Sequence, residues 1–98
     1  MAADFKILFH KSESSLHLKL LGTLDGSSAV ELLNTLKVNS LRASRVFIHT
    51  ASLGGIDPFG LSLFRTRFGE VKSKSTSFVF TGEKAFQLVP EREEAERM

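Results

Sequence analysis

Apolar and polar residues alternate in the first part of the chain. Every second residue is apolar from position 5 to 9 and again from 16 to 20, and a polar stretch lies between the two segments. A period of two is typical of a strand with one buried face. The segments therefore predict two strands that pair as a hairpin. The Gly-Thr-Leu-Asp-Gly stretch at 22–26 ends the second strand's pattern.

The pattern then changes to that of a helix. Apolar residues between positions 29 and 36 recur at intervals of three and four, which places them on one helical stripe. Ser28 precedes Glu31 by the spacing of a capping box, in which the two side chains bond the first free amides. These features predict a helix over 28–37 that begins at Ser28.

Two later apolar runs predict buried strands. Residues 46–48, Val-Phe-Ile, stand between Arg45 and His49. A short continuous run of this kind favours a central strand covered on both faces. Residues 78–82, Phe-Val-Phe-Thr-Gly, are rich in strand-forming residues and end in glycine, so they predict another strand.

A second helix is predicted to begin in the stretch Gly-Gly-Ile-Asp-Pro-Phe-Gly-Leu-Ser-Leu-Phe, residues 54–64. Asp57 can accept hydrogen bonds from the amides of the first turn. Pro58 suits the first helical position, where its missing amide costs nothing. Helical spacing then gives the buried stripe: Leu61, Phe64, Phe68 and Val71.

Two apolar residues fall on the other side of this second helix. At about 100° per residue, Phe59 and Leu63 lie beside Thr66, opposite the buried stripe. Exposed apolar residues that are neighbours on a helix often mark a contact surface. We expect Phe59 above all to be a recognition residue.

The end of the chain is predicted to be helical and charged. Residues 84–89 begin a last helical segment, which Pro90 interrupts. Residues 91–98 contain four glutamates and two arginines, so 90–98 is expected to form a charged C-terminal helix or a solvated tail. The whole chain, 1–98, is expected to be a single domain with its core in about 5–89.

The order of the predicted elements indicates the α/β class. Strands alternate with helices after the hairpin, which favours right-handed crossovers and a mixed sheet flanked by helices. About four strands are expected in that sheet.

Composition excludes several kinds of function. The net charge is only +2, with 13 basic residues spread along the chain, so no dense basic face for nucleic acid is expected. The chain has no cysteine, and its three histidines have no carboxylate at ligand spacing, so neither a metal site nor a cofactor is expected. No apolar run approaches the roughly 20 residues that span a membrane. We expect a soluble, cytoplasmic protein without direct membrane insertion.

Three segments resemble the STAS domain (sulfate transporter and anti-sigma factor antagonist). They are Gly-Thr-Leu-Asp at 22–25, Ile-Asp-Pro-Phe-Gly-Leu at 56–61 and Phe-Val-Phe-Thr-Gly-Glu at 78–83, in the order that the family has. The resemblance implies a STAS-like α/β domain. It also implies a bacterial signalling protein that regulates transcription by binding an anti-sigma factor or a switch-kinase-like regulator.

The resemblance also implies which residues bind the partner. They are Asp25, Ile56, Asp57, Pro58, Phe59, Gly60, Ser62 and Leu63. In the antagonists that the domain resembles, a serine in this loop accepts phosphate. Pro58 and Phe59 lie at the corresponding positions here and have no hydroxyl, so no phosphorylation is expected at that loop. Simple structural roles are also open for Asp57, as a helix cap, and for Asp25, as a turn residue.

Other functions remain open. The chain could be an accessory subunit of a membrane lipid or anion transport assembly, or a small-ligand sensor with a pocket near Gly54 and Gly55. It could also be a homodimer that covers a sheet edge with a second copy. It has no cysteine nucleophile and no motif of a serine elbow or paired carboxylates, so we expect that it is not an enzyme.

Overall fold

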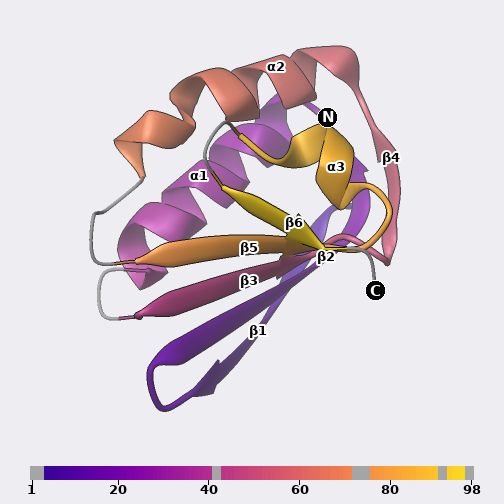
Figure 1. Cartoon of the computed structure of the whole chain (residues 1–98). Coiled ribbons are helices and arrows are strands. Elements are labelled where there is room, and N and C mark those ends of the chain that lie inside the picture. The colour runs from indigo at the N-terminus through magenta and orange to yellow at the C-terminus, as the bar shows by residue number, and fades with distance from the viewer. Residues whose placement is uncertain (1–3, 41–42, 72–75, 91–92, 97–98) are drawn as a thin grey trace.

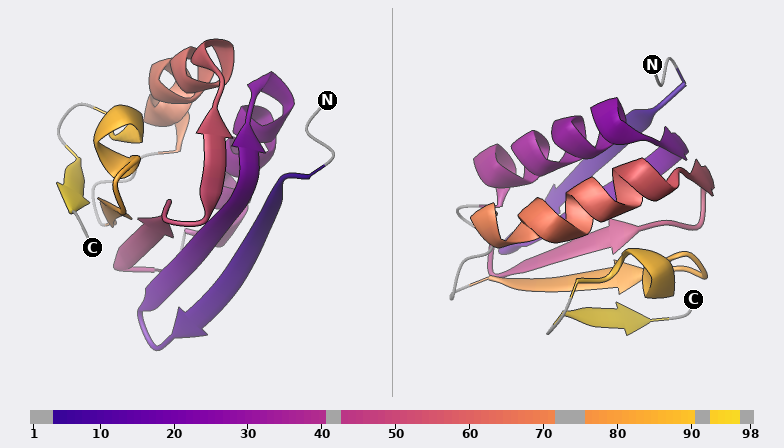
Figure 2. Two further views of the ribbon diagram at one scale, coloured as in Figure 1. Left: turned by 90° about the vertical axis from the view of Figure 1, so that its right-hand side faces the viewer. Right: turned by 90° about the horizontal axis from the view of Figure 1, so that it is seen from above.

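The computed structural model describes residues 4–40, 43–71, 76–90 and 93–96. The elements in chain order are β1 (Lys6–Ser12), β2 (Ser15–Leu24), α1 (Gly26–Asn39), β3 (Arg45–His49), β4 (Leu53–Ile56), α2 (Pro58–Arg67), the 3₁₀ turn η1 (Phe68–Glu70), β5 (Ser77–Thr81), α3 (Ala85–Leu88) and β6 (Glu94–Glu96). The helices cover one face of the sheet, and the other face is open (Figures 1 and 2).

The sheet is mixed, as the sequence predicts, but it has six strands in the described residues and not about four. Its order is β1-β2-β3-β5-β6, and β4 pairs with the far end of β2. The β1–β2 hairpin is antiparallel, and every other pairing is parallel. The α/β fold class is therefore confirmed.

The prediction missed β4 because its residues, Leu-Gly-Gly-Ile, have neither the length nor the alternation that marks a strand. The predicted end of the second strand at residue 22 was also wrong. β2 continues to Leu24, with a shift in register between Gly22 and Thr23 where its partner changes to β4. Gly22 permits this because its φ is +90°, a conformation that other residues rarely adopt.

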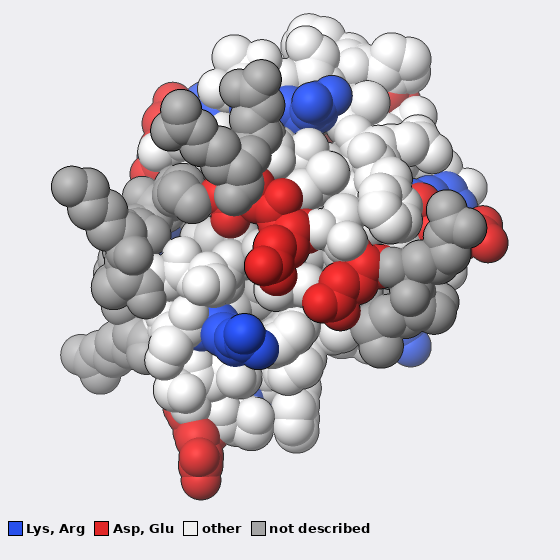
Figure 3. Space-filling view, viewed as in Figure 1, with Lys and Arg blue, Asp and Glu red and all other residues white. Residues whose placement is uncertain are grey.

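The predicted charged helix or tail at 90–98 was also wrong over residues 94–96, which form β6 parallel to β5. The sequence Glu-Ala-Glu has no strand pattern, and pairing with β5 makes it extended. Residues 91–92 and 97–98 lie outside the described part of the chain. Glu94 and Glu96 are exposed, and acidic side chains gather on this side of the molecule in the space-filling view (Figure 3).

The hydrophobic core lies between the sheet and the helices. Alternate residues of β2, β3 and β5 face the helices and are buried: Leu16, Leu18, Leu20, Val46, Ile48, Phe78 and Phe80. Phe64 of α2 meets Phe80 edge-on, with 6.0 Å between the ring centroids. The expectation that both faces of β3 are covered was wrong, because Phe47 lies on the open face and is only partly buried.

Helix α1 begins two residues earlier than predicted and is capped by a different residue. Asp25 is the N-cap, and its carboxylate accepts from the Ser28 amide at 3.0 Å. Ser28 lies inside the first turn, where its hydroxyl donates to the Thr23 carbonyl and to Asp25. The Ser28–Glu31 capping box is therefore absent, and an aspartate one turn earlier has that role.

Helix α2 begins as predicted. Asp57 is its N-cap, and Pro58 is in its first turn. In the predicted stripe, Phe64 is 0% exposed, Phe68 3% and Val71 7%, and Leu61 is partly buried. None of the helices in the described residues is both long and apolar enough to cross a bilayer.

Candidate functional site: the shared edge of two helix starts

Two helices begin side by side at one edge of the sheet. α1 follows the end of β2, and α2 follows the end of β4, which runs parallel to β2 and pairs with it. The Asp57 amide donates to the Leu24 carbonyl at 2.8 Å, which joins the two strand ends directly. In open α/β sheets, binding sites occur outside the carboxyl ends of the strands. This edge is therefore a candidate binding site.

Gly60 allows the two helix starts to approach closely. A Cβ atom at position 60 would lie 2.6 Å from the carbonyl carbon of Asp25 and 2.7 Å from its Cα. These are backbone atoms, so they cannot rotate away as a side chain can. Only glycine fits at position 60, because without a side chain the first turn of α2 can pack against the cap of α1.

Phe59 lies on the surface of this shared edge. Its side chain is 66% exposed, and its ring is next to Gly26, where an added Cβ would meet Cε2 at 2.8 Å. The ring therefore lies over the start of α1 with one side toward solvent. The predicted exposure of Phe59 is confirmed. Leu63 differs, because it is partly buried and packs against the core.

The two helix caps add carboxylates to this edge. The backbone amide of Ser28 donates to the Asp25 carboxylate and lowers its pKa, so the group is ionised at neutral pH. Asp57 accepts from the amides of Phe59 at 3.2 Å and Gly60 at 3.4 Å. Both helix starts thus already have anionic partners. The edge combines an exposed ring with two carboxylates and is not an empty anion site.

The structure brings the predicted site residues together. Asp25 comes from the β2–α1 junction, Ile56 ends β4, and the rest lie at the start of α2. Ile56 is partly buried, whereas Pro58 and Ser62 are exposed. The sequence placed these residues in two distant segments, and the pairing of β2 with β4, which the sequence did not predict, makes them neighbours.

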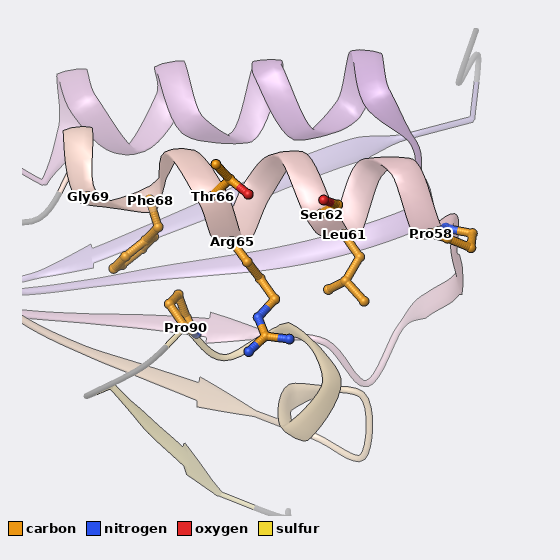
Figure 4. A pocket seen from close by; sticks show the side chains of 8 residues that line it. All are labelled: Pro58, Leu61, Ser62, Arg65, Thr66, Phe68, Gly69 and Pro90. Atoms are coloured by element: carbon orange, nitrogen blue, oxygen red, sulfur yellow. The ribbon is translucent and has the colours of Figure 1, made fainter.

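A groove beside this edge was not predicted. It has a volume of about 600 Å³ and is lined by Pro58, Leu61, Ser62, Arg65, Thr66, Phe68, Gly69 and Pro90. Arg65 extends from α2 toward the segment that contains α3 and Pro90 (Figure 4). A second hollow of about 250 Å³ is lined by Thr50, Ala51, Glu83 and Lys84. Gly54 and Gly55, near which a ligand pocket was expected, line neither of these.

The open face of the sheet carries a row of stacked rings. His17 and Phe47, on neighbouring strands, are stacked with 4.6 Å between centroids. His17 Nδ1 lies 3.0 Å from His49 Nε2, and His49 Nδ1 lies 2.6 Å from the Thr81 hydroxyl. Burial, and then the charges of His17 and Lys19, lower the pKa of His49. Among the residues described, no group of three or more His, Cys, Asp or Glu could hold a metal ion.

Comparisons with known proteins agree with this architecture. No protein-family model matches the sequence, and neither does any curated protein. Among solved structures, the anti-sigma factor antagonist SpoIIAA in its unphosphorylated form is similar. The match has a TM-score of 0.62 and 16% identity, and it covers 96% of this chain and 86% of that one. The chain has the fold of the anti-sigma factor antagonists.

A second antagonist structure supports the same conclusion. An anti-sigma factor antagonist from Mycobacterium paratuberculosis matches with a TM-score of 0.64 and 15% identity, over 83% of this chain and 71% of that chain. Both antagonists have the STAS fold that the three sequence segments predict. At such identities the similarity concerns the backbone, and function depends on the side chains of the site.

Proposed function

We propose that this protein is a non-catalytic regulatory module that binds a protein partner through the start of α2. The observation that carries the proposal is Phe59, which is 66% exposed at the edge where two helices begin. An aromatic residue that protrudes from a rigid, capped helix start loses little conformational freedom when a partner covers it. Such residues are frequent hot spots of protein interfaces.

The neighbouring groups define the rest of the contact surface. Ile56, Pro58 and Leu63 give it apolar area, Gly60 keeps it flat, and Ser62 adds an exposed hydroxyl. The carboxylates of Asp25 and Asp57 favour a partner with cationic or amide donors opposite them. By analogy with the antagonists of the same fold, an anti-sigma factor or a switch-kinase-like regulator in the cytoplasm is the partner that we propose.

Binding is proposed to need no phosphate switch in this loop. Pro58 and Phe59, the residues between Asp57 and Gly60, have no hydroxyl that could accept phosphate. Control would then come from the concentration of the partner or from a modification on it. Mass spectrometry of the protein isolated from its own cells should find no phosphate on residues 56–61.

The test is capture of partners by the wild-type protein and two variants. Phe59→Ala should lose the specific partner that the wild type retains. Phe86→Ala, which removes a ring of similar exposure (51%) from α3, should keep it. All three proteins should first be shown to have equal melting temperatures. Equal capture by wild type and Phe59→Ala would contradict the proposed docking surface.

The groove along α2 favours one second candidate, a small-ligand sensor. Its volume of about 600 Å³ is in the usual range of ligand sites, and Arg65 supplies a cation at an apolar surface of Leu61, Phe68 and Pro90. A ligand bound there would raise the melting temperature in a way that depends on its concentration. Arg65→Gln should remove that stabilisation, whereas Phe59→Ala should not.

A further inference from the structure

Strand β1 leaves one edge of the sheet open. Among the described strands, β1 (Lys6–Ser12) pairs with β2 alone. In an antiparallel pair, alternate residues turn their N–H and C=O groups outward. On β1 these groups face away from β2 and have no strand beside them. The left view of Figure 2 shows β1 at the margin of the sheet.

Two large apolar side chains of β1 are also exposed. Leu8 is 49% exposed and Phe9 is 52% exposed. Leu8 is paired with Lys19 and lies on the open face, whereas Phe9 is paired with Leu18 and lies on the helix-covered face. An additional strand beside β1 would therefore bury one of them on each face of the sheet.

The charges of β1 limit what could pair with it. Lys6 and Lys11 flank the apolar pair, and the strand contains neither Asp nor Glu. A second copy that paired antiparallel about a two-fold axis would keep each face of the sheet continuous, so it would place Leu8 opposite Leu8 or Phe9 opposite Phe9. It would bring two further lysines to this edge and no carboxylate to pair with them. The same lysines would attract a segment of opposite charge.

Two other occupants fit less well. A bilayer would leave the outward N–H and C=O groups of β1 unpaired in hydrocarbon, which costs several kcal/mol for each group. The acidic strand β6 of a second copy has only 3 residues, Glu94–Glu96. Pairing β6 with β1 would also be a head-to-tail contact, which builds a ring or an open filament and not a two-fold dimer.

We propose that the β1 edge binds an extended, acidic segment of a protein partner by strand addition. The outward groups of β1 form the main-chain hydrogen bonds, which give most of the affinity. Acidic side chains lie beside Lys6 and Lys11, and small apolar side chains between them cover Leu8 and Phe9. This surface is separate from the start of α2 and does not depend on the function proposed for it.

The test uses capped peptides and isotope-labelled, full-length protein. Glu-Thr-Val-Val-Thr-Glu reads the same in both directions, so it can add to β1 in a parallel or an antiparallel sense. It should slow hydrogen exchange at the β1 amides that do not bond to β2. Lys-Thr-Val-Val-Thr-Lys should bind at least about tenfold more weakly because its charges repel Lys6 and Lys11. The acidic peptide with both valine nitrogens methylated should not bind, because it keeps the charge but lacks the backbone donors.

Charge reversal on the protein is the second part of the test. Lys6→Glu combined with Lys11→Glu should reverse the preference, so that the basic peptide binds better. The control, Lys37→Glu combined with Lys84→Glu, makes the same change in net charge away from β1 and should keep the preference for the acidic peptide. Equal binding of the acidic and basic peptides, or binding of the methylated one, would overturn the proposal. Self-association in sedimentation, or binding to phosphatidylserine vesicles in place of peptide, would also overturn it.

Discussion

The two faces of the sheet are made by the same strands and have opposite characters. On the helix-covered face, Leu18, Ile48 and Phe80 are each 0% exposed and pack against apolar side chains. One residue away along the same strands, Lys19, Phe47 and Thr81 lie on the open face, which carries hydrogen-bonded histidines and charge. The difference shows that hydrophobic stabilisation is concentrated on the face where apolar strand residues meet the helices.

The largest expected effect comes from truncating a ring on the helix-covered face. Phe80→Ala should lower the free energy of unfolding by about 3–5 kcal/mol, because Phe80 is fully buried against Phe64 and Phe68. Phe47→Ala on the open face should cost about 1 kcal/mol, the worth of a stacked ring pair. Urea unfolding of both variants measures the contrast, and equal losses would contradict it.

A smaller loss of stability is expected from a substitution at the contact between the two helix starts. Gly60→Ala should destabilise the protein by about 1–3 kcal/mol, because the added Cβ overpacks the site against the backbone of Asp25. Gly69→Ala is the matched control, since an added Cβ there would have no atom within 4 Å. Thermal unfolding should show Gly69→Ala at or above the wild-type stability. A neutral Gly60→Ala would mean that the close approach of the helices is not required.

Removing a helix cap should cost about 1 kcal/mol. Asp25→Ala leaves the amide of Ser28 without its acceptor at the start of α1. Asp25→Asn should recover most of the loss, because asparagine is also a good N-cap. If Asp25→Asn is as unstable as Asp25→Ala in denaturant unfolding, the charge and not the cap is what stabilises this end.

The smallest expected effect is a pH dependence on the open face. The pKa of His49 is lowered in the folded protein, first by burial and then by His17 and Lys19. The unfolded chain therefore binds a proton more readily, and this contribution to stability is complete above the unfolded pKa, about 6.5. It is lost as the pH falls from there through the lowered folded value.

His49→Gln tests the direction of this pH dependence, because glutamine can hydrogen-bond but does not titrate. The loss of stability between neutral and mildly acidic pH should be smaller in His49→Gln than in the wild type, in chemical denaturation at several pH values. Parallel pH profiles would show that His49 is not responsible.

The sequence predicted the elements that have a strong period or a clear stop signal. The hairpin, the stripe of α2 and the Asp57 cap followed from local patterns, and together with the STAS resemblance they indicated the α/β fold. Strands β4 and β6 could not be predicted, because Leu-Gly-Gly-Ile and Glu-Ala-Glu become strands only through their neighbours. The Ser28 cap was wrong because the helix begins two residues earlier, at Gly26. Asp25 then lies just outside the helix, as a cap must, and accepts from the Ser28 amide.

The candidate site was predictable in its residues and not in its geometry. Phe59 was recognised because it breaks the polar side of α2. Its position over Gly26, and the contact of Gly60 with Asp25, depend on β4 pairing with β2. The groove with Arg65 and the His17–His49 bond could not be foreseen, since each joins residues from separate elements.

The most direct test of the central claim is a hydrogen-exchange footprint of the captured partner on this protein. We predict slower exchange at residues 25–28 and 56–63 in the complex. Exchange in strands β3 and β5, whose other face is not covered by helices, should not change. The protection should disappear in Phe59→Ala and persist in Phe86→Ala. Protection of β3 and β5 with residues 56–63 unchanged would contradict the account, because the partner would then bind the open face of the sheet and not the shared edge of the two helix starts.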